Sequence, residues 1–253
     1  MVEDKITVKS TSDRAKMIEG GKKLAEVKNA LMEKVGIGVS GLDIEKLANR
    51  LIERSGGKAS FKMVPGYSWA TCVNINQGVV HGIPKKEMVF KKGDIVSVDV
   101  GLFYKGFHTD TSFSVGLDLD ESGNTFLKTG ENALEKAISV TKAGNRIYDI
   151  SQAIQQTIES AGYSSIRALV GHGVGKDLHE APQIPCFTYG KREDSILIKQ
   201  GHVYAIEVMY VEGNPDVVQD NDGWTISTHD GKISALFEET VAVTKKGPMV
   251  LTQ

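Results

Sequence analysis

The chain has 253 residues, 40% of them hydrophobic, and a formal net charge of -2, which is typical of a soluble globular protein whose core needs no disulfide. Its two cysteines, Cys72 and Cys186, are too few for a disulfide framework, and the first residues lack the apolar stretch of a signal peptide, so we expect a cytoplasmic location. No segment has the about 20 consecutive apolar residues of a membrane-spanning helix, and lysine and arginine are scattered, which argues against membrane insertion and specific nucleic-acid binding.

The first predicted elements are two amphipathic helices. Apolar residues recur at helical spacing over residues 12–35, although Lys28 interrupts the apolar face. Ser40 and Asp43 have the spacing of a capping box at the start of a second helix, and Gly56 lies just past its end. The pattern therefore predicts a helix pair near the N-terminus.

The second half of the chain repeats this order of elements. Two further helices are predicted around residues 126–138 and 147–158, where apolar residues again follow helical spacing. The predicted strand GDIVSVDV aligns with the later segment GHVYAIEV, and the alignment puts Asp99 on Glu207. The two halves therefore resemble copies of one unit.

A short turn, Tyr-Lys-Gly, joins two strands of the first half, which predicts an antiparallel hairpin and favours an α+β fold over a doubly wound parallel sheet. The segments TDTSFSV and EETVAV also align, with Asp110 and Glu238 at nearly corresponding places. We expect two pseudo-twofold-related αβ halves, roughly residues 12–118 and 124–250, around a central antiparallel-rich curved sheet. No linker rich in proline or serine separates the halves, so residues 1–253 are predicted to form a single domain.

Four acidic residues lie in apolar strands, where a charge is costly. Asp99 is expected to share one strand face with Ser97, while the valines on either side of it point to the other face. A carboxylate in such a place loses its hydration, which costs several kcal/mol unless it is paired. The repeat brings Glu207, Asp110 and Glu238 to the same neighbourhood, and carboxylates that close either share protons or bind cations. Because no arginine matches them, the four acids indicate a metal site.

Two alternatives stay open at this point. Any one acid alone is more often a hydrogen-bonded core residue, and a pair can serve the chemistry of aspartic proteases or glycosidases. His172 favours the metal, because it lies between two glycines in GHGVGKDLHEAP, which leaves room beside the imidazole for an ion. The glycines of that segment lack the spacing of a dinucleotide-binding or P-loop motif. Several carboxylates with one imidazole suit Mn, Fe, Co or Zn.

The order of these residues resembles that of the methionine aminopeptidases of the pita-bread fold, and the resemblance extends over almost the whole chain. The chain begins directly with the first helix and has no long insertion before the last strands, as in the type I, bacterial-style subgroup. The matching segments are VVHGIP with His81, VSVDVG with Asp99, GFHTDTS with Asp110, GHGVGKDLHEAP with His172 and His179, AIEVMY with Glu207 and SALFEET with Glu238.

The resemblance implies an aminopeptidase that removes the initiator methionine from nascent proteins by two-metal hydrolysis, with a preference for a small second residue. Asp110 and Glu238 would bridge two divalent ions, which are Co, Mn, Fe or Zn in this class of site. Asp99 would complete one metal site, and His172 with Glu207 would complete the other.

The same resemblance assigns two further roles and a binding pocket. Glu207 would also carry the proton from the attacking water to the leaving amine, His179 would donate to the carbonyl oxygen, and His81 would contact the substrate near the scissile amide. The pocket for the methionine side chain would be formed by three residues, although ordinary packing accounts for them nearly as well: Tyr67, Cys72 and Trp224.

Some positions depart from the pattern of the family. Glu239 stands where a histidine is common and is expected to add negative charge beside the site, whereas Leu178 replaces an aromatic residue next to His179. The departures spare the five predicted metal ligands, and we expect Leu178 and Val64 to reshape the side-chain pocket.

Two rival functions remain at this level. A proline-selective aminopeptidase of the same fold would use the same ligands with another pocket, and a non-catalytic relative would act through protein contacts after losing ligands. The expected partners are the N-termini of nascent polypeptides, with a transient ribosome association and a monomeric enzyme, because no long apolar surface stripe is left over.

Overall fold

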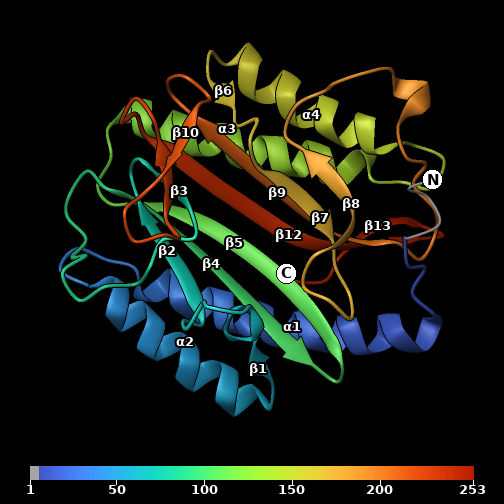
Figure 1. Ribbon diagram of the computed structural model, residues 1–253, viewed down its shortest axis with the longest axis horizontal. Helices are drawn as coiled ribbons and strands as arrows, with labels where there is room; N and C mark the ends of the chain where they lie inside the picture. The colour runs from blue at the N-terminus through green and yellow to red at the C-terminus, as the bar shows by residue number, and fades with distance from the viewer. Residues whose placement is uncertain (1–5) are drawn as a thin grey trace.

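A computed structural model describes residues 6–253 of the chain, and its centre is a ten-stranded sheet. The strand order is β1-β4-β5-β12-β9-β7-β8, with β2 and β6 paired to β4 and β9, and β13 paired to β12 (Figure 1). The long central strands are β4 (Ile95–Tyr104), β5 (Phe107–Gly116), β9 (Val203–Val211) and β12 (Ser234–Thr244). The outer strands are β1 (Lys58–Ala59), β2 (Thr71–Ile75), β6 (Ser164–Ser165), β7 (Val170–Gly173), β8 (Glu180–Pro185) and β13 (Gly247–Val250).

A second, three-stranded sheet joins β10 (Val217–Gln219), β11 (Ile226–Thr228) and β3 (Gly78–Val80). The strand pairs in both sheets are antiparallel. Two short 3-10 turns, η2 (Phe61–Met63) and η3 (Arg192–Asp194), lie in the connections. The prediction of an α+β fold with an antiparallel-rich central sheet is thus confirmed.

Within residues 6–253, four helices form two pairs, as the apolar periodicity predicted. The first pair is α1 (Thr11–Lys34) and α2 (Gly41–Ser55), and the second is α3 (Glu121–Val140) and α4 (Ile147–Ser160). The predicted capping box is present at α2, where Ser40 Oγ accepts from the backbone N–H of Asp43 at 3.2 Å and the Asp43 carboxylate accepts from the backbone N–H of Ser40 at 3.0 Å. Gly56 ends this helix in the left-handed region, with φ 78°.

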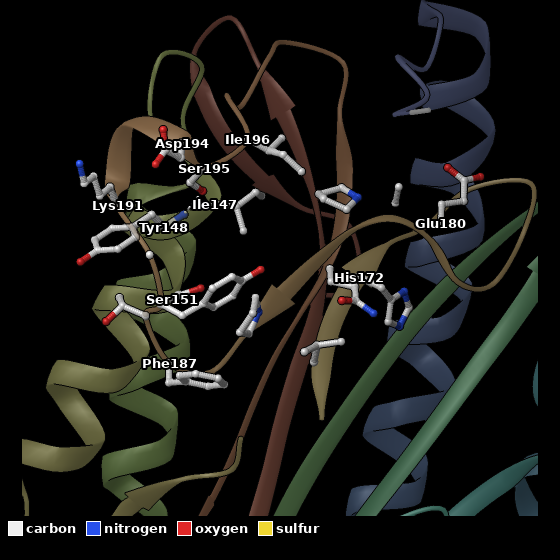
Figure 2. Close-up of a pocket in the computed structure, with 18 of the residues that line it drawn as sticks. Ile147, Tyr148, Ser151, His172, Glu180, Phe187, Lys191, Asp194, Ser195 and Ile196 are labelled. Carbon is white, nitrogen blue, oxygen red and sulfur yellow. Dashed lines mark hydrogen bonds between the residues drawn. The ribbon is translucent and has the colours of Figure 1, made fainter. Parts of the chain in front are cut away.

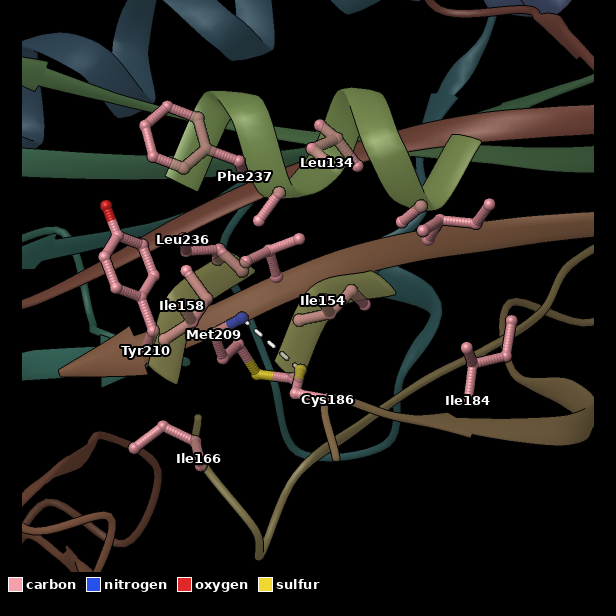
Figure 3. Packing of buried hydrophobic residues seen from close by; sticks show 14 of the residues in the cluster. Leu134, Ile154, Ile158, Ile166, Ile184, Cys186, Met209, Tyr210, Leu236 and Phe237 are labelled. Atoms are coloured by element: carbon pink, nitrogen blue, oxygen red, sulfur yellow. Dashed lines mark hydrogen bonds between the residues drawn. The ribbon is translucent and has the colours of Figure 1, made fainter. Parts of the chain in front are cut away.

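Each helix pair builds a hydrophobic core against its own part of the sheet. Under α1 and α2 the core contains Val96, Val98 and Val100 of β4, and under α3 and α4 it contains Val208 and Tyr210 of β9. Figure 3 shows the second core, in which α3 and α4 lie against the sheet. Because side chains alternate along a strand, these packed residues turn their neighbours to the opposite face.

The hairpin between β4 and β5 turns within two residues. Lys105 and Gly106 both have positive φ, 49° and 86°, as the tight turns of two-residue hairpins require. This turn fixes the register of the two strands, in which Asp99 lies opposite Ser112. Within residues 6–253 no helix has the length and apolarity to cross a bilayer.

Candidate metal centre

The sheet register gathers the predicted ligands on the face that points away from the helices. Residues directly opposite each other form one row across five strands, from Cys72 through Asp99, Ser112 and Glu238 to Glu207. Opposite residues in a sheet, and residues two apart in a strand, share one face. All five side chains of this row therefore point to the same side.

The two remaining predicted ligands join the row by the same rule. Asp110 lies two residues before Ser112 in β5, and His172 of β7 lies opposite Ala205, which is two residues before Glu207 in β9. Asp110, His172 and Glu238 each offer an atom such that all three atoms lie within 4.8 Å of one another. The Nε2 atom of His172 lies 4.0 Å from Oε1 of Glu207.

Burial and mutual repulsion raise the pKa values of the carboxyl groups. Burial raises the pKa of Asp99 to about 7. Burial and then the charges of Asp99 and Glu207 raise the pKa of Asp110 well above its usual value, and Glu238 responds to burial and then to Asp110 in the same direction. Oδ1 of Asp99 is buried and has no hydrogen-bond partner within residues 6–253. Such an unsatisfied oxygen among acids fits a divalent cation, which would compensate the charge of several carboxylates at once.

His172 is held in the tautomer that a metal ligand needs. Its Nδ1 lies 2.9 Å from the carbonyl oxygen of Gly173, so Nδ1 carries the proton and donates to this oxygen. Burial lowers the pKa of His172 to about 4, which keeps the ring neutral and leaves the lone pair on Nε2. The flanking glycines are required, because a Cβ on Gly171 would meet the carbonyl oxygen of Ala205 at 2.8 Å.

The predicted pocket residues lie together beside this centre. A cavity of about 140 Å³ is lined by the acids, by His172 and by the predicted substrate-binding residues Tyr67, Cys72, Trp224, His81 and His179. Tyr67 packs edge-on against Trp224, with ring centroids 5.0 Å apart.

The two predicted substrate histidines occupy the rim of the cavity, where both are exposed. His81 has φ 59°, in the left-handed region that few residues other than glycine adopt. His179 stacks edge-on against His172, with ring centroids 4.6 Å apart, and desolvation lowers the pKa of His179. Both imidazoles therefore stand at the entrance of the cavity next to the acids.

Sequence reasoning missed part of the lining. Phe61 and Val80 also border the cavity, next to Val64 and Leu178, which were expected to shape it. The sequence gives little indication that Phe61 lines a cavity, because this residue lies in the short η2 turn rather than in a helix or strand with periodic apolar residues. The segment around η2 folds back because the backbone N–H of Ser60 donates to the carbonyl oxygen of Gly101 at 3.0 Å.

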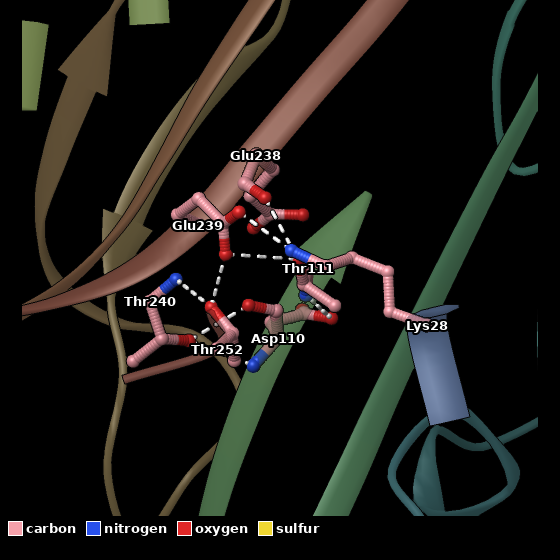
Figure 4. Close-up of polar contacts among 7 residues, drawn as sticks. All are labelled: Lys28, Asp110, Thr111, Glu238, Glu239, Thr240 and Thr252. Atoms are coloured by element: carbon pink, nitrogen blue, oxygen red, sulfur yellow. Dashed lines mark hydrogen bonds and ion pairs between the residues drawn. The ribbon is translucent and has the colours of Figure 1, made fainter. Parts of the chain in front are cut away.

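We expected Glu239 to add negative charge beside the site. In the structure this charge is paired with a lysine. Glu239 follows Glu238 in β12 and therefore points to the helix-covered face, where Nζ of Lys28 lies 2.5 Å from its carboxylate (Figure 4). The hydroxyls of Thr111 and Thr252 also donate to this carboxylate. Lys28 thus interrupts the apolar face of α1 because it neutralises a buried acid behind the metal centre.

The chain is similar in sequence and in structure to known metallopeptidases. Metallopeptidase family M24 matches residues 15–245 of the chain. A methionine aminopeptidase from Aquifex aeolicus is 40% identical over 238 residues, which cover 91% of this chain and 92% of that protein. The crystal structure of methionine aminopeptidase from Thermotoga maritima has a TM-score of 0.95 at 41% identity and covers 98% of this chain and 99% of that one. A prolidase from Pyrococcus furiosus has a TM-score of 0.78 at 18% identity, with 100% of this chain and 67% of that chain covered, which shows the shared pita-bread fold alone.

The raised carboxyl pKa values predict how pH acts on the metal-free protein. The unfolded carboxyl groups lose their protons near about pH 4, whereas the folded site keeps protons up to its raised pKa values. The free energy of unfolding therefore falls as pH rises between these limits and levels off above the folded pKa values. Asp110→Asn cannot take on the charge, and its stability should fall less over this range. Urea unfolding of chelator-treated protein at pH 6 and pH 8 measures the two slopes, and equal slopes would contradict the prediction.

The buried pair behind the site predicts a second effect. Lys28→Met leaves the Glu239 carboxylate buried without its cation, which should lower the free energy of unfolding by about 3 kcal/mol. The matched control is Lys105→Met, which removes an exposed pair with Glu19 and should cost less than about 1 kcal/mol. The double variant Lys28→Met/Glu239→Gln should recover part of the loss. Similar losses for Lys28→Met and Lys105→Met would refute this account.

Proposed function

Because the chain belongs to metallopeptidase family M24, we propose that it is a metal-dependent aminopeptidase that removes methionine from the N-termini of polypeptides. The observation that carries the proposal is the single row of Asp99, Glu238 and Glu207 on one sheet face, joined there by Asp110 and His172. A relative at 40% identity, covered over 92% of its length, is named for methionine, whereas the prolidase likeness at 18% identity concerns the fold. The proline-selective alternative is therefore disfavoured.

Two divalent ions fit the donor set best. Asp110 and Glu238 would be shared by both ions, Asp99 would complete one metal site, and His172 with Glu207 would complete the other. Such ions activate a water molecule and polarise the scissile carbonyl. Co, Mn, Fe and Zn all match a set of four carboxylates and one imidazole.

The chain's own residues then orient the substrate and move the proton. The methionine side chain enters the cavity between Tyr67, Cys72 and Trp224, whose aromatic rings and thiol suit a polarizable thioether. His81 contacts the scissile amide and His179 donates to its carbonyl oxygen. The carboxylate of Glu207 accepts the proton of the attacking water and passes it to the leaving amine.

The proposal extends to the setting of the reaction. The substrates are the N-termini of nascent chains with a small second residue, met by a monomeric enzyme during a transient association with the ribosome. Cys72 and Cys186 are both free and buried, which suits the reducing cytoplasm. We also propose that residues 1–253 form one catalytic domain with two related halves, since each helix pair covers two of the four central strands.

The direct test of the function is metal-dependent release of methionine. Chelator-stripped protein should release free methionine from the peptide Met-Ala-Ser only after Mn, Co, Fe or Zn is added. The peptides Leu-Ala-Ser and Ala-Pro-Ser serve as controls for the side-chain pocket and for the proline-selective alternative. An absence of release with every metal, although metal binding is measured, would refute the proposal.

The division between ligands and acid–base groups predicts different losses. Asp110→Ala should abolish activity together with metal binding, because it removes a bridge. His179→Ala should keep the metal and lower kcat about 100-fold, as the loss of an oxyanion donor does. His229→Ala, which changes an exposed histidine elsewhere, should change neither. Metal content by mass spectrometry and kcat separate the two roles, and a metal-free His179→Ala protein would show that the division is wrong.

A further inference from the structure

A large groove starts at the same two histidines that border the methionine pocket. It has a volume of about 890 Å³ and is lined at one end by His172 and His179, from which it runs along β8 towards the first turn of α4 (Figure 2). These histidines also line the small cavity that contains the acids. The groove and the cavity therefore meet where the scissile bond would lie.

The far wall of the groove is aromatic and lies opposite the two histidines. Tyr148 of α4, Phe187 and Tyr189 line it, and Tyr189 is 69% exposed, although it is a large side chain. The rim adds both signs of charge, with Lys191 and Asp194. Aromatic side chains supply a large contact area for a bound chain at a low cost in conformational entropy.

This wall is held in place by hydrogen bonds between α4 and the segment 187–196. The backbone N–H of Tyr148 donates to Oγ of Ser195 at 2.9 Å, and the backbone N–H of Ile147 donates to the carbonyl oxygen of Ile196 at 3.0 Å. The guanidinium of Arg192 donates to both carboxylate oxygens of Asp149, at 2.6 and 2.7 Å.

A second anchor lies at the other end of the segment, where Oε1 of Gln155 accepts from the backbone N–H and the hydroxyl of Thr188, both at 2.8 Å. Contacts within the chain itself therefore hold the wall of the groove. A preformed groove lowers the conformational entropy that binding must overcome.

The floor of the groove is an edge strand that resists continuous strand pairing. β8 ends the main path of the large sheet, and the groove follows its residues. N–H groups along a strand point to its two edges in turn, so Pro182 and Pro185, three residues apart, can remove only one backbone N–H donor from the free edge, which still disfavours addition of a regular strand from another copy. We therefore expect the aromatic wall, rather than a backbone ladder, to supply most of the contacts.

We propose that this groove binds the substrate polypeptide downstream of its second residue. The inference rests on the proposed function, because the N-terminal residue fills the small cavity and the following chain must leave past His172 and His179. The occupant is an extended, unfolded polypeptide of varied sequence. The groove lowers KM for long substrates without touching the bond that breaks.

Peptide length tests the proposal in the metal-loaded enzyme. The kcat/KM for the seven-residue peptide Met-Ala-Ser-Leu-Lys-Val-Glu should exceed that for Met-Ala-Ser about tenfold, mainly through a lower KM. The double variant Tyr148→Ala/Phe187→Ala should lose this advantage, whereas its kcat/KM for Met-Ala-Ser should stay within about twofold, because the short peptide ends before the aromatic wall. Tyr104→Ala, a change outside both cavities, should keep the full length dependence.

A binding measurement separates this proposal from the proposed function. Calorimetric titration of the metal-free protein with the seven-residue peptide and with Met-Ala-Ser needs no catalysis, and the longer peptide should bind about tenfold tighter to the wild type but not to the double variant. Equal affinities for the two lengths, or a length effect that survives in Tyr148→Ala/Phe187→Ala, would overturn the groove proposal. Loss of activity on both peptides with the length effect on binding intact would instead refute the peptidase while keeping the groove.

Discussion

The rest of the structure depends on one electrostatic constraint, which is that four carboxyl groups share one buried patch of a sheet. Glu207 and Glu238 lie directly opposite each other on β9 and β12, an arrangement that is unfavourable for two like charges. The strands tolerate it because the opposite face of the sheet is packed under two helix pairs, whose cores hold the register. Bound cations would turn this repulsion into attraction, so the stability of the site and its chemistry have the same origin.

Strand alternation divides the acids between two environments. Glu238 points to the cavity, whereas its neighbour Glu239 points to the helices and is paired with Lys28. Without this cation, a fifth negative charge would lie next to Glu238 in the chain, and it would raise further the pKa of Glu238, which Glu239 already raises. The pair therefore allows β12 to carry two consecutive acids, only one of which faces the metal centre.

Periodicity and symmetry made much of this arrangement predictable. The helical spacing, the capping box at Ser40 and the alignment of Asp99 with Glu207 were sufficient for the helix pairs and the central strands. Lys28 was visible only as an interruption, because its partner lies 211 residues away on another element. The cavity residue Phe61 and the aromatic groove depend on how loops fold back over the sheet, for which local sequence carries no periodic signal. The internal repeat itself stays a prediction.

The two cavities suggest how one enzyme can be strict about the first residue and tolerant of the rest. The small cavity is lined by packed aromatic rings and by strand residues, so a change of one side chain there alters the contacts of the whole residue. The groove is larger and offers aromatic faces with charges of both signs at its rim, which give contact area to an extended chain. On this view selectivity arises in the small cavity, and affinity for long substrates arises in the groove. His172 and His179 mark the boundary between the two, which is also where the peptide bond would be hydrolysed.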